Sequence, residues 1–195
     1  MTYILVVVLV GFLLILSLYM ATKACSRKKA TMDRAKSLLL VMSSVETHPM
    51  LARLLDRLAG SLGALGFDVD STIWRRTEIT PVGAARWIHE QVGSYDHVII
   101  CMGLDGGMQE GTCDVTDPFP VVLDLAQHGN LKNYSVVSFN RRNKFWSFLF
   151  LPRIFEIPDE FYDLAKNIST NLNLKEIIRV KKMLKKELAE IIGNY

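Results

Sequence analysis

The sequence lacks the residue patterns that most catalytic and metal sites require. It has three cysteines, Cys25, Cys101 and Cys113, and no two of them have the spacing of a zinc site or form a disulfide framework. The motifs G-x-S-x-G, H-E-x-x-H, C-x-x-C and the P-loop are all absent. The four histidines fall in separate predicted elements. The spacing of these residue types therefore indicates no active site and no metal site. The low cysteine content fits a reducing compartment.

A strongly basic folded region is also missing. Residues 23–36 carry +5 and residues 175–190 carry +3, so the total of +3 leaves −5 for residues 37–174. A nucleic-acid-binding domain would concentrate Lys and Arg on its folded surface. The segment "NRRNKFW" at 140–146 mixes basic and aromatic side chains, but it is a single cluster in an acidic region. We predict no nucleic-acid partner.

Charged side chains are absent from residues 3–22, which are mostly Val, Leu, Ile and Phe. About 20 helical residues cross a hydrocarbon layer of about 30 Å, which predicts a transmembrane helix within residues 1–22. A secretory signal peptide is the alternative, with "ATKAC" as a cleavable segment. The absence of a preceding basic residue and the length of the apolar run favour the membrane anchor.

Basic residues follow this apolar run and form a juxtamembrane segment at 23–35. The positive-inside rule predicts a short N-terminus outside and a cytosolic main body. Anionic lipid is then the expected contact of four basic side chains, Lys23, Arg27, Lys28 and Lys29. Cys25 is a candidate palmitoylation site, and an unmodified thiol is the alternative. The glycosylation sequons at Asn133 and Asn167 would remain unmodified in this topology.

Apolar runs alternate with helical patterns through residues 36–170. Predicted strands are 37–43, 67–71, 96–103, 134–140 and 148–152, and predicted helices are 47–66, 80–92, 117–129 and 157–168. Gly66 ends the first helix and Gly129 lies near the end of the third. Buried strands that alternate with helices predict an α/β fold with a parallel sheet flanked by helices.

A basic amphipathic helix is predicted within residues 171–195. Its apolar stripe consists of Ile177, Val180, Leu184, Leu188 and Ile191, with lysines on the opposite side. This pattern has three interpretations: a solvated helix docked on its own domain, a partner-binding helix, or a membrane-surface helix.

The segment "WRRTEITPVGAARWIHEQV" at 74–92 is a loop followed by a helix. Thr80 is predicted as the N-cap and Pro81 as the first helical residue. Helical spacing assigns Trp87 to the core. Glycine-rich residues 103–111 lack the G-x-G-x-x-G spacing, and their acidic side chains would repel phosphate, so we expect a surface loop and no small-molecule ligand.

These pieces together resemble the SEFIR domain, the TIR-like cytosolic module of interleukin-17 receptors and their adaptor. The most specific match is "DVDSTIWRRTEITPVGAARWIHEQV", which contains the family's strand, acidic residue, Trp, charged residues, Glu-Ile, Gly and Arg-Trp-Ile-His. Further matches are Ser43-Ser44, His48-Pro49 and "DHVIICMG". The similarity covers about residues 36–170, although the segment after the third strand is shorter than in related receptors.

The resemblance implies a flavodoxin-like or TIR-like sheet without a cofactor and homotypic assembly with a SEFIR-domain adaptor or receptor. By analogy with TIR-like modules, we expect the partner-binding residues to be Trp74, Arg75, Arg76, Glu78 and Arg86. Because about two residues precede the apolar run, cytokine capture is not carried over, and the chain is either a tethered module or part of a receptor. It could recruit the adaptor or sequester it.

The enzymatic alternative is NAD cleavage, which some TIR domains carry out with a glutamate on the helix after the third strand. That helix here reads "DPFPVVLDLAQ", with Asp124 and no glutamate, and Glu110 lies in the preceding loop. The pattern therefore favours a protein-interaction module over an enzyme.

Overall fold

The computed structural model describes residues 35–42, 49–102, 115–139 and 153–193. The chain divides into two compact units, residues 1–35 and residues 36–195. The predicted anchor and the basic segment after it lie outside the described residues. Within the described ranges, no helix has the length and apolar character needed to cross a membrane.

Five parallel strands form one sheet in residues 36–195. They are β1 (Ser37–Met42), β2 (Asp68–Ser71), β3 (His97–Met102), β4 (Tyr134–Ser138) and β5 (Ile154–Glu156), in the order β2-β1-β3-β4-β5. This is the flavodoxin-like order of a doubly wound sheet. The predicted α/β fold with a parallel sheet flanked by helices is therefore confirmed. The strand predicted at 148–152 lies outside the described residues, and β5 was not predicted.

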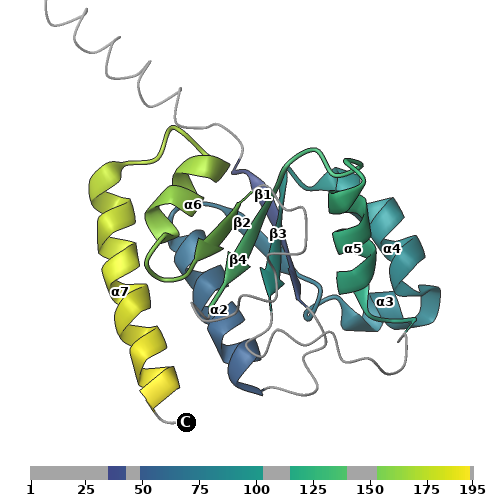
Figure 1. Cartoon of the computed structure of the whole chain (residues 1–195), viewed down its shortest axis with the longest axis horizontal. Helices are drawn as coiled ribbons and strands as arrows, with labels where there is room; N and C mark the ends of the chain where they lie inside the picture. Colours follow the sequence, from purple (N-terminus) through teal and green to yellow (C-terminus); the bar gives the residue numbers. More distant parts are fainter. Residues whose placement is uncertain (1–34, 43–48, 103–114, 140–152, 194–195) are drawn as a thin grey trace, which may run out of the picture. The chain divides into compact units, whose positions relative to one another are not determined.

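Helices cover both faces of this sheet (Figure 1). One layer contains α2 (Pro49–Ala64), α6 (Phe161–Ile168) and α7 (Leu174–Gly193). The other layer contains α3 (Arg76–Val82), α4 (Ala84–Gln91) and α5 (Pro118–Gln127), with a short 3₁₀ turn, η2 (Val92–Ser94), after α4. Successive strand residues alternate between the two layers: Leu38 and Leu40 pack on the first, and Leu39 and Val41 on the second.

Among the described residues, the two apolar cores and the side chains packed against them lie between Leu38 and Ile191. The described residues of the unit 36–195 thus form an apolar core on each face of its sheet. We therefore expect a fragment of residues 33–195 to fold on its own.

The start predicted for the helix at 80–92 is wrong. A helix already begins at Arg76, and Thr80 lies inside it, donating its hydroxyl hydrogen bond to the Arg76 carbonyl at 2.8 Å. Pro81 is inside the same helix, in its last turn. Gly83, with φ of 81°, ends this helix and is the N-cap of the next, α4. A positive φ suits glycine, so the break falls at residue 83 instead of at Thr80.

Other predicted helix features agree with the structure. Gly66, with φ of 89°, follows α2. The Asp117 side chain accepts a hydrogen bond from the Phe119 amide at 2.9 Å and caps α5. Trp87 is buried, as predicted. The apolar stripe of α7 packs into the same core as α2 and α6, so this helix is docked on its own domain.

Candidate functional site

Trp74 is exposed on a turn that is itself firmly held. Residues 72–75 connect β2 to α3, and the amides of Trp74 and Arg75 both donate to the Ser71 carbonyl, at 3.0 and 3.2 Å. The Thr72 amide donates to Leu40 in β1 at 3.0 Å, and Ile73 packs against the core. The Trp74 side chain nevertheless remains 50% exposed. The chain thus holds a large aromatic side chain in water on an ordered backbone.

Arg75 links β2 to α3 through two carboxylates. Its Nε donates to Asp70 Oδ2 at 2.7 Å, and its Nη1 donates to Glu78 Oε1 at 2.7 Å. Asp70 Oδ2 also accepts a hydrogen bond from the Tyr95 hydroxyl at 2.9 Å, and Asp70 Oδ1 accepts one from the Ser71 amide. Arg75 is therefore engaged within the domain, where its two ion pairs join the turn that carries Trp74 to β2 and α3.

The electrostatics of this cluster follow from these contacts. The hydrogen bond to Glu78, followed by the one to Asp70, raises the pKa of Arg75 above its ordinary value. Burial, followed by the hydrogen bond to Asp70, raises the pKa of Tyr95 to about 12. Both side chains are thus held in the protonated form that donates to Asp70. The cluster thus places one guanidinium between two carboxyl groups.

The structure brings together only some of the predicted partner-binding residues. Arg75 and Glu78 lie in one cluster, with Trp74 beside them in sequence, and Arg76 is the exposed first residue of α3. Arg86 belongs to α4, where its Nε donates to Glu90 Oε1 at 2.8 Å. Arg86 therefore makes its ion pair along its own helix, and the Arg75 cluster does not include it.

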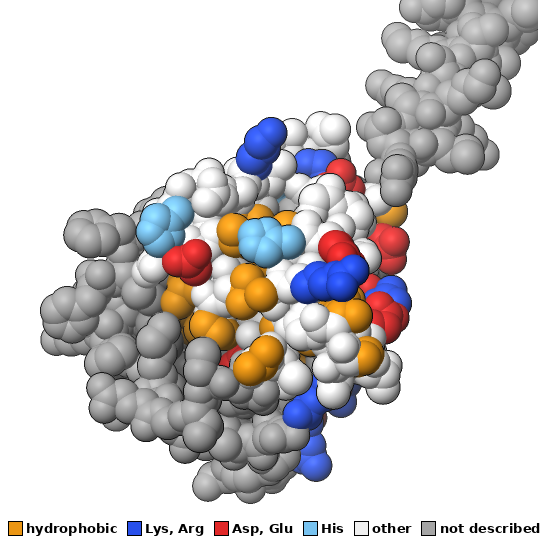
Figure 2. All heavy atoms as spheres, turned by 90° about the vertical axis from the view of Figure 1, so that its right-hand side faces the viewer, with side chains coloured by type: hydrophobic (Ala, Val, Ile, Leu, Met, Phe, Trp, Pro, Cys, Tyr) orange, Lys and Arg blue, Asp and Glu red, His pale blue; other side chains and the backbone are white. Residues whose placement is uncertain are grey.

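An apolar corner between α3 and α4 was not predicted. The Ala84 amide donates to the Val115 carbonyl at 3.0 Å, which holds Val115 beside the corner that ends at Gly83. Val115 is 76% exposed, and Val82, just before the corner, is exposed as well. Figure 2 looks onto this layer and shows apolar side chains at the surface among charged and histidine side chains. Helical periodicity gives no signal for this corner, because it joins residues from two distant segments.

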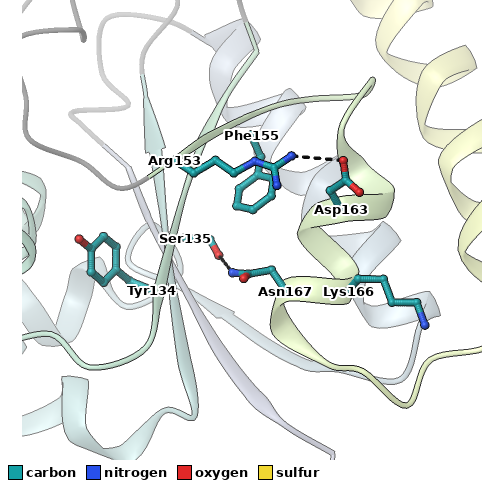
Figure 3. Close-up of a pocket in the computed structure, with 7 residues that line it drawn as sticks. All are labelled: Tyr134, Ser135, Arg153, Phe155, Asp163, Lys166 and Asn167. Carbon is teal, nitrogen blue, oxygen red and sulfur yellow. Dashed lines mark hydrogen bonds and ion pairs between the residues drawn. The ribbon is translucent and has the colours of Figure 1, made fainter.

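A groove of about 420 Å³ lies at the amino end of β4, beside β5 and α6 (Figure 3). It is lined by Tyr134, Ser135, Arg153, Phe155, Asp163, Lys166 and Asn167. Arg153 pairs with Asp163 at 3.3 Å and lies over the Phe155 ring, 4.6 Å from its centroid. Lys166 donates to the carbonyls of Thr170 and Leu172. The charged groups of this groove thus have contacts within the chain, and α/β sheets bind ligands at the opposite, carboxyl edge.

A buried serine–histidine pair adjoins the groove. The hydroxyl of Ser135 lies 2.9 Å from His97 Nε2 and accepts a hydrogen bond from Asn167 Nδ2 at 2.9 Å. Burial, with a smaller effect of Lys36, lowers the pKa of His97 to about 4. A general base near neutral pH needs a pKa close to 7, so this imidazole is a weak base. The pair is suited to satisfying buried polar groups rather than to nucleophilic catalysis.

Other candidate residues add no reactive site among those described. Cys101 is fully buried in β3, and burial raises the pKa of its thiol. Asp124 is exposed on α5 and lies 3.1 Å from His128. The part of the chain that the structure describes has no cluster of side chains able to hold a metal ion. Glu110 and the predicted lipid-contact residues Lys23, Cys25, Arg27, Lys28 and Lys29 lie outside it.

Comparison of the chain with models of known protein families and with curated proteins gives no match. The functional argument therefore rests on the chain's own geometry. That geometry favours the surface around Trp74 and the α3–α4 corner as the candidate functional site. It combines an exposed aromatic side chain, exposed aliphatic side chains and a bridging arginine.

Proposed function

We propose that residues 36–170 form a protein-interaction domain that docks on another domain of the SEFIR type. In this proposal, residues 3–22 anchor the protein in a membrane and the domain faces the cytosol. The partner is a SEFIR-domain adaptor or receptor, and the assembly carries interleukin-17-type signalling. The sequence resemblance supplies the identity of the partner.

Trp74 is the single observation that carries the proposal. Tryptophan is among the residues that most often dominate binding energy at protein interfaces. When a partner buries a large apolar side chain that was in contact with water, the free energy of the complex is lowered. The turn makes hydrogen bonds to β1 and β2, so docking would require little ordering of the backbone.

The surrounding residues contribute in different ways. Arg75 and Glu78 position the turn, because they form the bridge to Asp70. Arg76 and Arg86 are exposed cations at the margin, where charge affects the association rate and partner choice more than the affinity. The exposed valines at the α3–α4 corner, Val82 and Val115, offer a second apolar contact.

The decisive experiment measures how much SEFIR-domain adaptor is retained from cytosol by residues 33–195. Wild type is compared with Trp74→Ala and with Met183→Ala. Met183 is a matched control, because it is a large apolar side chain, 55% exposed, on α7. We expect Trp74→Ala to lose the adaptor and Met183→Ala to retain it, both with wild-type melting temperatures.

Two results would count against the proposal: no adaptor bound by the wild-type fragment, or equal retention by Trp74→Ala. The variant Trp74→Ala/Arg75→Ala/Arg76→Ala extends the test, but its melting temperature must be measured because Arg75 is part of the bridge. Recruitment and sequestration use the same surface. Expression of the full chain with a reporter of inflammatory transcription separates them, since a recruiting protein raises the signal and a sequestering one lowers it.

A further inference from the structure

The side of α7 that points away from the core carries a row of basic residues. Lys175, Arg179, Lys182 and Lys186 recur at i, i+4, i+7 and i+11, which places them on one side of the helix. All four side chains are exposed, whereas Ile177, Val180, Leu184 and Leu188 are buried on the other side. The apolar stripe of this helix is therefore already used by the domain, and the basic row is left at the surface.

Most charges of α7 fall on separate sides of the helix, apart from Glu176 and Glu190, which lie three and four residues from Arg179 and Lys186. Glu187 lies 3.8 Å from Arg57 on α2, which places it on the α2 flank. On the α6 flank, Lys185 lies 3.5 Å from Asp159, and Lys181 donates to the Asp159 carbonyl. Between these flanks, Lys186 has a distant pair with Glu190 at 3.9 Å. Within the described part of the chain, Lys175, Arg179 and Lys182 make no ion pair, so this row complements an anionic surface.

Two exposed apolar side chains border the basic row. Leu174 is 50% exposed and Ile178 is 54% exposed, one turn apart on the helix. Ile178 precedes Lys182 by one further turn, so apolar and basic groups share this side of α7. A lipid interface takes up both kinds of group, because the acyl boundary accepts the aliphatic side chain and the headgroups attract the lysines. A soluble polyanion would use only the charges.

We propose that this side of α7, defined by Leu174, Lys175, Ile178, Arg179, Lys182 and Lys186, is a contact surface for an anionic lipid bilayer. The contact is peripheral: the helix stays docked on the domain and presents its outer side to the headgroups. It does not depend on the proposed docking surface, because Trp74 and the α3–α4 corner lie outside α7. A membrane anchor at residues 3–22 would keep the domain within reach of such a bilayer.

The test is sedimentation of residues 33–195 with phosphatidylcholine vesicles that contain or lack phosphatidylserine. Wild type is compared with Arg179→Gln/Lys182→Gln and with Arg53→Gln/Lys132→Gln. The second pair is matched, because it also removes one Arg and one Lys from exposed positions, and both lie outside α7. Each cation near an anionic surface accounts for about a fivefold change in binding, so the α7 pair should weaken binding about 25-fold and the control pair far less.

Two further variants make the source of the anion clear. Arg179→Lys/Lys182→Arg keeps the charge and should bind vesicles as wild type does. Ile178→Ser should weaken vesicle binding and leave binding to heparin, a soluble polyanion, unchanged. No binding to phosphatidylserine vesicles, equal losses in the two Gln pairs, or no effect of Ile178→Ser would each overturn the proposal. The assay contains no protein partner, so its failure would leave the adaptor experiment unaffected.

Discussion

The Tyr95 hydroxyl donates a hydrogen bond to Asp70 at 2.9 Å, although the two residues are 25 positions apart in sequence. Asp70 is in β2, Tyr95 lies just before β3, and β1 separates the two strands in the sheet. The same Asp70 oxygen accepts from Arg75. Three segments of the chain thus meet at one carboxylate beneath the turn that exposes Trp74.

Tyr95→Phe should lower the free energy of unfolding by about 1–2 kcal/mol at pH 7, because it removes a hydrogen bond to a charged acceptor. The control is Tyr162→Phe, since the Tyr162 hydroxyl has no hydrogen-bond partner among the described residues, and it should change little. Urea unfolding measures both. Equal effects of the two substitutions would show that the Tyr95 hydroxyl contributes nothing specific.

The raised pKa of Tyr95 also predicts a dependence on alkaline pH. An unfolded Tyr ionises near pH 10, whereas the folded value is about 12. The stabilisation is therefore fully present below pH 10 and is lost as the pH rises towards 12. Ultraviolet absorbance titration of wild type against Tyr95→Phe isolates this hydroxyl. If the difference between the two titration curves shows a group that ionises near pH 10, the Tyr95 hydroxyl is not in the buried, hydrogen-bonded environment described.

Trp74 and Arg75 should separate binding from stability. Trp74→Ala should weaken adaptor binding by about 2 kcal/mol or more while changing the free energy of unfolding by less than about 0.5 kcal/mol. Arg75→Ala should lower stability by about 1 kcal/mol, because it removes a partly exposed two-carboxylate bridge. The control Arg53→Ala removes an exposed arginine from α2 and should weaken neither adaptor binding nor stability. An unfolded Trp74→Ala would assign this side chain to the fold.

His97 should make the domain sensitive to mild acid. Its pKa is about 4 in the folded chain and about 6.5 when unfolded, so the unfolded state binds more protons between these values. Stability should fall as the pH drops from 6.5 towards 4, by on the order of 3 kcal/mol from this group. Urea midpoints across this range should have a smaller slope in His97→Gln than in wild type.

Docking of α7 on its own domain predicts opposite results at neighbouring positions. Leu184→Ala should lower the free energy of unfolding by about 2–5 kcal/mol, because Leu184 is fully buried against the core that includes α2 and α6. Met183→Ala should change it by less than about 0.5 kcal/mol. Chemical denaturation of both variants is the measurement. A small effect at Leu184 would mean that the helix leaves the domain readily in solution.

The glycosylation sequons test the proposed topology. Asn133 and Asn167 are both exposed, so a luminal or extracellular domain would present them to the glycosylation machinery. With the domain in the cytosol, the full chain expressed in cells should show no change in mobility after endoglycosidase treatment. A sequon introduced into a secreted reporter controls for enzyme activity. A mobility shift of the chain would place the domain on the other side of the membrane.

Sequence patterns predicted the fold well where burial is continuous. β1 and β3 are buried on both faces, so their apolar runs are unambiguous, and the leucine spacing of α2 matches the face that packs on the sheet. The edge strand β5 is three residues long and only one of them is buried, which leaves no periodic signal. The start of α3 was missed because Thr80 and Pro81 form a common capping pattern, whereas the actual break depends on Gly83.

The candidate site was predictable in composition but not in the roles of its residues. An aromatic side chain among arginines indicates an interface, and Trp74 is indeed exposed. The engagement of Arg75 depends on its contacts with Asp70 and Glu78 in the folded chain, and residue spacing in the sequence does not predict these contacts. The contact of Val115 with the α3–α4 corner likewise joins segments that are about 30 residues apart.

The two helical layers described above lie on opposite faces of one sheet (Figure 1). A bilayer in contact with α7 would therefore leave the α3–α4 layer directed away from lipid and open to the solvent. The domain would then meet partners by lateral diffusion, with its rotation restricted and its α3–α4 layer already oriented. Confinement of this kind raises the local concentration of partners on the same membrane, so a weak contact at Trp74 would suffice for assembly.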